Sequence, residues 1–172
     1  AIGVWDQLQA RAAPHEHLRL IDATGRLLRA PEVTFDAAEL GGGPFGYNIR
    51  NSDLAAAMAG RLAAFPGLHA RARAACALEP LGDKVRITGA DGSVVEAALV
   101  AAADGRNSLC REAAGITLSR HDYPQVALAF NISHVVPHDS VSTEFHTPSG
   151  PLTFVPLEGN ASSVVWVVRP DE

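Results

Sequence analysis

The feature that most constrains the fold is the stretch 99–111, in which a small apolar run is followed by Asp104-Gly105 and then by a helix start at Ser108. The run 97–103 does not alternate apolar and polar residues, which is typical of a strand buried on both faces. Gly105 permits a tight turn and a close approach of a ligand to the backbone. The free amides at the helix start carry a partial positive charge suited to phosphate. The stretch therefore predicts a strand, a turn and a helix that meet a dinucleotide.

A second Asp-Gly pair, Asp91-Gly92, provides an internal control. Residues 84–88 alternate apolar and polar side chains, and residues 93–96 return after the turn, which predicts a β-hairpin. The pair at Asp104 precedes a helix instead of a second strand. The two copies therefore predict different local structures.

The short helix after Ser108 is predicted to have that serine as its N-cap and to end near Gly115. Arg111 occupies the third helical position, where a cation opposes the helix dipole and where glutamate would complete a capping box. Its side chain can pair with Asp104, bind a phosphate, or extend into solvent. The sequence leaves these three interpretations open.

These residues also carry a family resemblance. Asp104-Gly105-x-x-Ser108-x-x-Arg111 after a small-residue strand resembles the Asp-Gly fingerprint of the FAD-dependent aromatic hydroxylases, the flavin monooxygenases related to p-hydroxybenzoate hydroxylase. Further segments resemble this family in the same order, and the late ones are similar to the branch of 2-octaprenyl-6-methoxyphenol hydroxylases of ubiquinone biosynthesis. These segments are 3–8, 46–54, 145–152, 155–157 and 164–166.

The resemblance implies an enzyme that holds FAD, reduces it with NAD(P)H, and hydroxylates a phenolic, prenylated ubiquinone precursor with oxygen. It places Asp104 and Gly105 beside the ribose and pyrophosphate of FAD, with Ser108 and Arg111 in support. It also implies that Asn51 or Arg50 reaches the flavin, Arg50 being the less certain because the family's arginine matches position 51. The cofactor carries the chemistry, so no side chain is assigned as a catalytic acid, base or nucleophile.

Two family motifs are missing from the sequence: no Gly-x-Gly-x-x-Gly follows a strand, and no late Gly-Asp segment is present. We therefore expect an internal fragment of a longer enzyme that by itself is inactive and binds FAD weakly or not at all. The alternatives are a flavin-dependent reductase or halogenase of the same superfamily, and a non-catalytic ligand-binding module.

The composition limits the kinds of partner that the chain is expected to bind. The formal charge of -5 with no basic cluster argues against nucleic acid binding. No apolar run approaches the roughly 18 residues that span a bilayer, and no leader sequence is recognisable. A cytoplasmic location is expected. An apolar, prenylated substrate is also compatible with association of the enzyme with the inner membrane surface or with a biosynthetic complex. Cys76 and Cys110 are predicted to be reduced and buried, and the histidine spacings predict no metal site.

The predicted fold class is mixed α/β, with residues 1–118 as the middle part of an FAD-binding domain and 119–172 as part of an antiparallel substrate-binding sheet. Helix is expected at 4–12 and from Ser52, which Asn51 or Ser52 itself would cap. Four aromatic residues on predicted strands favour core packing, with one of the four in a substrate pocket; they are Phe130, Phe145, Phe154 and Trp166. Strands are expected at 18–21, 33–35, 47–49, 68–78, 84–88, 93–96, 97–103, 126–132, 141–145, 152–155 and 164–168.

Overall fold

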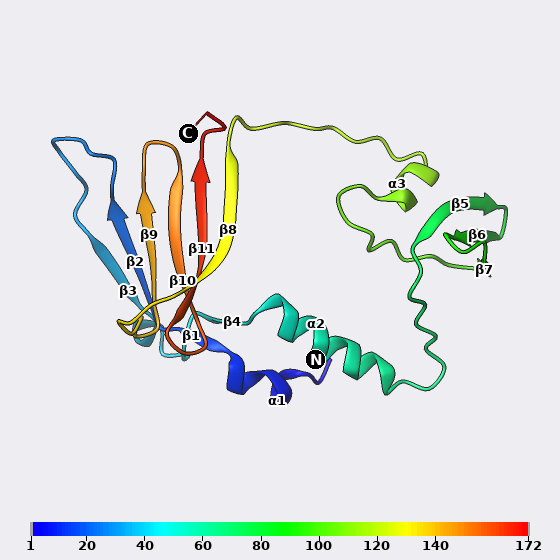
Figure 1. Ribbon diagram of the computed structural model, residues 1–172, viewed down its shortest axis with the longest axis horizontal. Coiled ribbons are helices and arrows are strands. Elements are labelled where there is room, and N and C mark those ends of the chain that lie inside the picture. Colours follow the sequence, from blue (N-terminus) through cyan, green and yellow to red (C-terminus); the bar gives the residue numbers. More distant parts are fainter. Residues whose placement is uncertain (1, 172) are drawn as a thin grey trace. The chain divides into compact units, whose positions relative to one another are not determined.

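The computed structural model describes residues 2–171, and these form two compact units (Figure 1). Unit 1 consists of residues 1–68 and 123–172, and unit 2 consists of residues 69–122. Unit 1 is therefore discontinuous in sequence, and unit 2 is inserted between its two parts. This division differs from the predicted one at residues 118/119, because strands of the first 36 residues join the sheet formed by the last 50.

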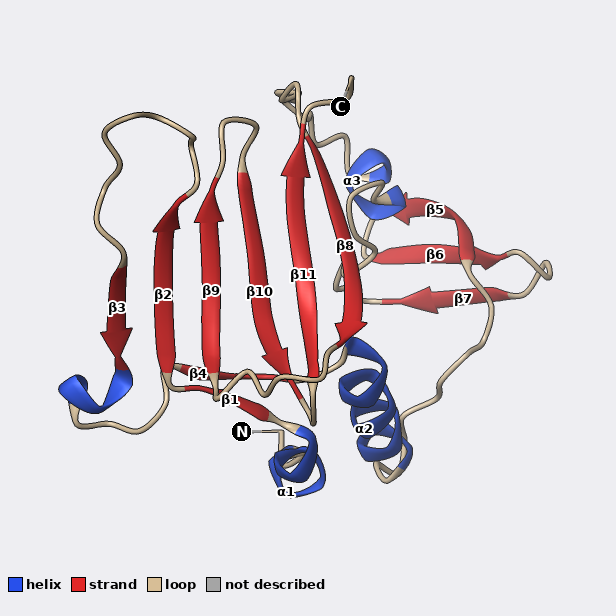
Figure 2. Cartoon of the chain, turned by 60° about the vertical axis from the view of Figure 1, so that its left-hand side comes forward, coloured by secondary structure: helices blue, strands red, loops and turns tan. Residues whose placement is uncertain are grey.

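A six-stranded sheet forms most of unit 1, in the order β3-β2-β9-β10-β11-β8 (Figure 2). Every neighbouring pair is antiparallel except β2 and β9, which run parallel. The strands expected at 126–132, 141–145, 152–155 and 164–168 are all present, and the mainly antiparallel sheet is confirmed. The strands are β2 (His17–Asp22), β3 (Val33–Asp36), β8 (Val126–Ser133), β9 (Val141–His146), β10 (Pro151–Leu157) and β11 (Ala161–Val168).

The two faces of this sheet differ in character. The pairing register places all four strand aromatics on one face, because paired residues project to the same side. Phe145 and Phe154 pack edge to face with ring centroids 6.0 Å apart. Phe130 and Trp166 remain 45% and 41% exposed, so core packing is found for only part of the set. We call this side the aromatic face and the other side the polar-pair face, after the Asn131–Ser163 pair on it.

Short elements surround one end of this sheet. The helix α1 (Trp5–Leu8) continues into the 3-10 helix η1 (Gln9–Arg11), which confirms the helix predicted at 4–12 in two pieces. A two-stranded antiparallel sheet, β1 (Ala13–His15) with β4 (Gly46–Asn48), lies near β10, and η2 (Ala37–Leu40) connects β3 to the glycine-rich loop. The helix α2 (Asn51–Ala63) follows β4 directly.

Unit 2 is a three-stranded antiparallel sheet with one short helix. The strands β5 (Ala75–Leu81), β6 (Lys84–Gly89) and β7 (Val94–Ala97) form consecutive hairpins, and α3 (Leu109–Ala113) packs against β5. Arg86 on the central strand reaches Glu79 and Glu96 on its two neighbours at 3.3 and 2.9 Å. The Asp91-Gly92 turn joins β6 and β7, so the predicted hairpin is confirmed.

One predicted strand in this unit starts later than expected, and another is absent. The strand predicted at 68–78 begins only at Ala75, and residues 98–103 form no strand at all. A strand buried on both faces needs neighbours that supply hydrogen bonds, and among residues 2–171 nothing pairs with 98–103. Leu99 is accordingly 85% exposed. The composition of 97–103 identifies an apolar segment, but it does not identify a neighbouring strand with which the segment could pair.

The cysteines are unpaired, but the prediction that they are buried is wrong: Cys76 is exposed and Cys110 is half-buried. Within residues 2–171 no group of three metal-ligating side chains lies close enough to hold a metal ion. No helix in the same range is long and apolar enough to span a bilayer.

Candidate functional site

The turn at Asp104 is held by a chain of hydrogen bonds. The Ser108 hydroxyl donates to Asp104 Oδ1 at 2.6 Å, and the Cys110 amide donates to Oδ2 at 3.1 Å. Ser108 Oγ in turn accepts from the Arg111 amide at 3.0 Å, so Ser108 is the predicted N-cap of α3. Asp104 therefore fixes the turn to the start of the helix.

These bonds favour the ionised carboxylate. The hydrogen bond from Ser108, followed by that from the Cys110 amide, lowers the pKa of Asp104 to about 2. Desolvation and the neighbouring carboxylate raise the pKa of the Cys110 thiol above its ordinary value. At neutral pH the turn thus presents a carboxylate and a protonated thiol.

Gly105 has φ +79°, a conformation that side chains with a Cβ rarely adopt. A Cβ built at this position meets no atom within 4 Å, so the backbone here is open to a ligand. Gly115 ends α3 with φ +65°, as the sequence predicts. Gly105 is therefore required by the conformation of the turn.

The guanidinium of Arg111 does not pair with Asp104. Its Nη2 donates to the carbonyl of Arg106 at 3.1 Å, which bridges the loop before the helix. The first of the three interpretations of this arginine is therefore wrong in this structure. The predicted phosphate contact stays a prediction.

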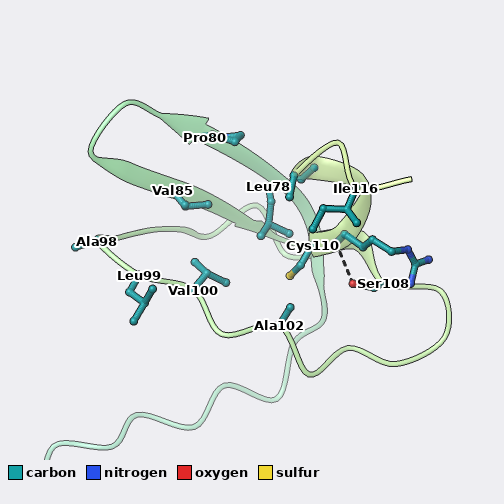
Figure 3. A pocket seen from close by; sticks show the side chains of 13 residues that line it. Leu78, Pro80, Val85, Ala98, Leu99, Val100, Ala102, Ser108, Cys110 and Ile116 are labelled. Atoms are coloured by element: carbon teal, nitrogen blue, oxygen red, sulfur yellow. Dashed lines mark hydrogen bonds between the residues drawn. The ribbon is translucent and has the colours of Figure 1, made fainter. Parts of the chain in front are cut away.

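A cavity of about 430 Å³ lies next to this element within unit 2 (Figure 3). Apolar side chains of β5, β6 and the segment 98–102 form most of its wall, and Ser108 and Arg111 contribute polar groups. Figure 3 shows Leu78, Val100 and Cys110 around the same space. The sequence analysis missed this cavity because it treated 97–103 as a paired strand.

Replacing Ser108 with alanine is expected to destabilise unit 2 by about 1 kcal/mol, the usual cost of losing an N-cap. The variant removes the acceptor for the Arg111 amide and the donor to Asp104. The measurement is urea unfolding of wild type and variant. Ser93→Ala is the control, because it removes from a turn of the same unit a hydroxyl that bonds Asp91 but caps no helix; an equal loss in both variants would contradict a capping role for Ser108.

The other two predicted contacts, Arg50 and Asn51, lie in unit 1 where β4 passes into α2. Arg50 is the N-cap residue with extended backbone, and its carbonyl accepts from the Asp53 and Leu54 amides at 3.0 and 3.1 Å. No side chain caps the helix, so the prediction that Asn51 or Ser52 does so is wrong. The side chains of Asn51 and Ser52 do not cap the helix, because α2 begins at Asn51, one residue earlier than predicted.

A polar cavity of about 360 Å³ adjoins this junction. Residues 48–52 form one wall, and the polar-pair face of the sheet forms the other with Asn131, Ser163 and Leu157. The structure therefore brings Arg50 and Asn51 together around one cavity. The sequence analysis missed Asn131 and Ser163, although a polar residue inside the otherwise apolar pattern 126–132 was a usable signal.

Asn48 closes one side of this cavity and is held in place. Its Nδ2 donates to the carbonyl of Pro156 at 3.1 Å and contacts Nε2 of His15. Burial lowers the pKa of His15 below its ordinary value of 6.5, and the hydrogen bond with Asn48 offsets part of this shift.

This arrangement predicts a pH dependence of unit 1. A histidine whose folded-state pKa is depressed stabilises the fold above its unfolded pKa, and this stability is lost as pH falls below 6.5 and protons are taken up preferentially by the unfolded chain. We expect the unfolding free energy to decline between pH 7 and 5 in wild type, and to decline less in His15→Gln. Equal slopes in urea titrations of the two proteins would contradict this expectation.

The fold of this chain matches solved structures over 98–99% of its length. It is similar to the structure of HpxO from Klebsiella pneumoniae in complex with FAD and uric acid, with a TM-score of 0.71, 18% identity, and coverage of 98% of this chain and 45% of that one. It is also similar to PqsL from P. aeruginosa, with a TM-score of 0.76 and 16% identity over 99% of this chain and 48% of that one.

The FAD binding domain family matches residues 1–172, and the chain belongs to this family. Ubiquinone hydroxylase UbiL of Rhodospirillum rubrum is 37% identical over 172 residues, which are 99% of this chain and 39% of the relative. The 3-demethoxyubiquinol 3-hydroxylase of Escherichia coli is 35% identical over 98% of this chain and 42% of the relative. The chain thus spans about two fifths of the length of these relatives, and the resemblance read from the sequence is confirmed.

Proposed function

We propose that this chain is the middle part of a FAD-dependent monooxygenase that hydroxylates the phenolic ring of a ubiquinone precursor with NAD(P)H and oxygen. The observation that carries the proposal is the match over nearly the whole chain to two relatives whose names describe hydroxylation in ubiquinone metabolism. Membership of the FAD binding domain family supports the cofactor.

The residues present fit the cofactor. Around the cavity of unit 1, the side chains of Arg50, Asn51 and Ser52 are uncommitted donors suited to the polar edge of a flavin ring. In unit 2, the backbone at Gly105 is open, while Asp104 and Ser108 hold the turn rigid. We assign Arg50 and Asn51 to the flavin, and Asp104, Gly105, Ser108 and Arg111 to the ribose and pyrophosphate.

FAD, when bound and reduced, supplies the oxygen chemistry. The chain's own residues bind and orient: Asn48 is fixed by His15 and Pro156 and keeps the cavity wall in place. The sheet opposite α2 forms the other wall of the cavity. No acid or base within residues 2–171 is assigned to the reaction, since every assigned group is a positioning or binding group.

The test uses the full-length enzyme that contains this chain. We expect purified protein to carry stoichiometric FAD and to convert a prenylated phenol into a product heavier by one oxygen atom, with NAD(P)H consumed in equal amount. Mass spectrometry of the product and labelled oxygen gas check this outcome. Oxidation of NAD(P)H without oxygen in the product would replace the hydroxylase proposal with a flavin-dependent reductase.

Location is part of the same proposal. An apolar tail on the substrate favours a cytoplasmic enzyme that associates with the inner membrane surface or with other enzymes of the route. Exposed apolar side chains in α2 and just after it, among them Met58, Leu62 and Phe65, support contact with apolar material. Co-sedimentation of the full-length enzyme with vesicles tests this, and an enzyme that stays in the supernatant at low salt would contradict it.

A further inference from the structure

The loop that joins β2 to β3, residues 23–32, presents two leucines to solvent. Leu27 is 100% exposed and Leu28 is 87% exposed. Figure 2 shows this loop extending beyond one end of the six-stranded sheet. Two adjacent leucines at the end of a loop add nothing to the core of unit 1, and they are available to a partner.

The base of this loop is closed by Asp22. Its Oδ1 accepts from the amide and the hydroxyl of Thr24 at 3.0 and 2.6 Å, and its Oδ2 accepts from the Ala30 amide at 2.9 Å. The hydrogen bond from the Thr24 hydroxyl is the main cause that lowers the pKa of Asp22 to about 2, so the carboxylate stays ionised at neutral pH. One carboxylate therefore holds both ends of the loop and leaves residues 26–29 as its tip.

The tip, residues 26–29, is basic as well as apolar. Arg26 precedes the two leucines and Arg29 follows them, and both arginines are exposed. The Arg29 Nε donates to the Arg26 carbonyl at 3.4 Å, which keeps the two cations on the same short turn. Since the chain has a formal charge of -5, the tip is a local positive site on an acidic protein.

The acidic groups around the tip are already engaged. Asp22 accepts hydrogen bonds from the loop itself, although its charge also acts on Arg26. Glu32, at the other end of the loop, lies 3.8 Å from Arg19. The β9–β10 loop, residues 147–150, lies at the same end of the sheet and contains no charged residue. The positive charge of the tip is therefore available to an anionic surface.

We propose that the tip is a membrane-contact element: the two leucines enter the apolar region of a bilayer, and the two arginines bind the phosphates of anionic phospholipids. Leucine side chains gain free energy on leaving water, and the donors of arginine fit phosphate oxygens. Insertion of two leucines is shallow, so binding is reversible and depends on anionic lipid. A narrow tip suits a deformable lipid surface, whereas a protein partner would need a matching pocket.

This inference rests on the proposed function, which gives the substrate an apolar tail and the enzyme a place at the membrane, and it names the element that makes the contact. The tip is separate from the cavity assigned to the flavin. Asn131 and Ser163 line that cavity near the end of the sheet where β2 begins, whereas the tip follows the end of β2. Changes at the tip should therefore leave the chemistry intact.

The test measures sedimentation of the full-length holoenzyme with two kinds of vesicle, phosphatidylcholine alone and phosphatidylcholine with phosphatidylglycerol. We expect wild type to bind the anionic vesicles, and to bind them less at high salt. The double variant Leu27→Ser/Leu28→Ser should bind them at least about tenfold more weakly, because it removes the apolar contact. Arg26→Gln/Arg29→Gln should also lose about tenfold on anionic vesicles, but it should bind neutral vesicles as wild type does.

Val135→Ser/Val136→Ser is the matched control. These two valines are 93% and 71% exposed in the β8–β9 loop, residues 134–140, which lies at the opposite end of the sheet and contains no arginine or lysine. Their replacement should leave vesicle binding unchanged. The inference is overturned if this control loses as much binding as the leucine variant, if neither tip variant changes binding, or if wild type does not bind anionic vesicles.

Two further results would assign the tip or the contact differently. A loss of vesicle binding confined to Met58→Ser/Leu62→Ser would assign the membrane contact to α2 and overturn the inference. Tip variants that bind vesicles normally but differ from wild type in molecular mass by light scattering would assign the tip to a protein contact, with the same consequence.

Hydroxylation of a water-soluble phenol with a short side chain separates this inference from the proposed function. The tip variants should hydroxylate it with the kcat/KM of wild type. A wild type that forms the product but does not bind vesicles refutes only the membrane contact. Vesicle binding that depends on the tip, without any hydroxylated product, refutes only the hydroxylase. Circular dichroism melting identifies a double variant that is unfolded, and the single substitution Leu27→Ser or Arg26→Gln then takes its place.

Discussion

Gly105→Ala is expected to raise the dissociation constant for FAD of the full-length enzyme by at least about tenfold, or about 1.4 kcal/mol. The added Cβ lies where the open backbone is proposed to approach the ribose and pyrophosphate. It also forces an alanine into a left-handed conformation at φ +79°, at a cost of about 1–2 kcal/mol in stability. Flavin fluorescence titration measures the affinity, and urea unfolding measures the stability.

Gly92→Ala provides the matched control. Gly92 follows an aspartate as Gly105 does, has φ +78°, lies in the same unit, and also has no atom within 4 Å of an added Cβ. The loss of stability should therefore be similar in the two variants. If the affinity for FAD falls equally in both, the effect comes from general destabilisation, and the assignment of Gly105 to the cofactor is wrong.

Val164→Ala is expected to destabilise unit 1 by roughly 2–3 kcal/mol, since it removes two buried carbon groups and leaves a cavity. Val164 is 2% exposed and sits in register between Phe130 and Phe154 on the aromatic face. Alanine would leave the centre of the sheet without its largest fully buried aliphatic side chain. Chemical unfolding gives the free energy directly.

Val165→Ala, one residue later, serves as the comparison. Val165 projects to the opposite face and is 39% exposed, so its truncation should cost less than about 1 kcal/mol. A difference of this size between adjacent, identical side chains would establish which face is packed. Equal losses would show that the register of β11 differs from the one described.

The sequence predicts local structure well where a local signal exists. The strands from Val126 onward are rich in β-branched and aromatic residues, and α3 has Ser108 as a cap and Gly115 as a stop, so the local sequence predicts both. The start of α2 was less accurate, because two plausible caps, Asn51 and Ser52, follow the residue that the backbone actually uses, Arg50.

Features that depend on distant partners were not predictable from local patterns. The strand expected at 97–103 failed because its sequence specifies apolar character and not a neighbour. The parallel pairing of β2 with β9 joins segments that are separated in the sequence by all of unit 2, and no local sequence pattern indicates it. The cavity lined by Asn131 and Ser163 was unpredictable for the same reason. Only the sheet register and the position of α2 bring these two residues close to Arg50.

The parallel pairing of β2 with β9 has a consequence for the order of events during synthesis. The β2–β3 hairpin leaves the ribosome early, but the edge of β2 that β9 covers stays exposed until unit 2 has been translated. Unit 2 consists of consecutive hairpins and can close as it emerges. A nascent chain paused before Val141 would thus expose a bare strand edge, and this is the stage at which chaperone binding or aggregation is expected.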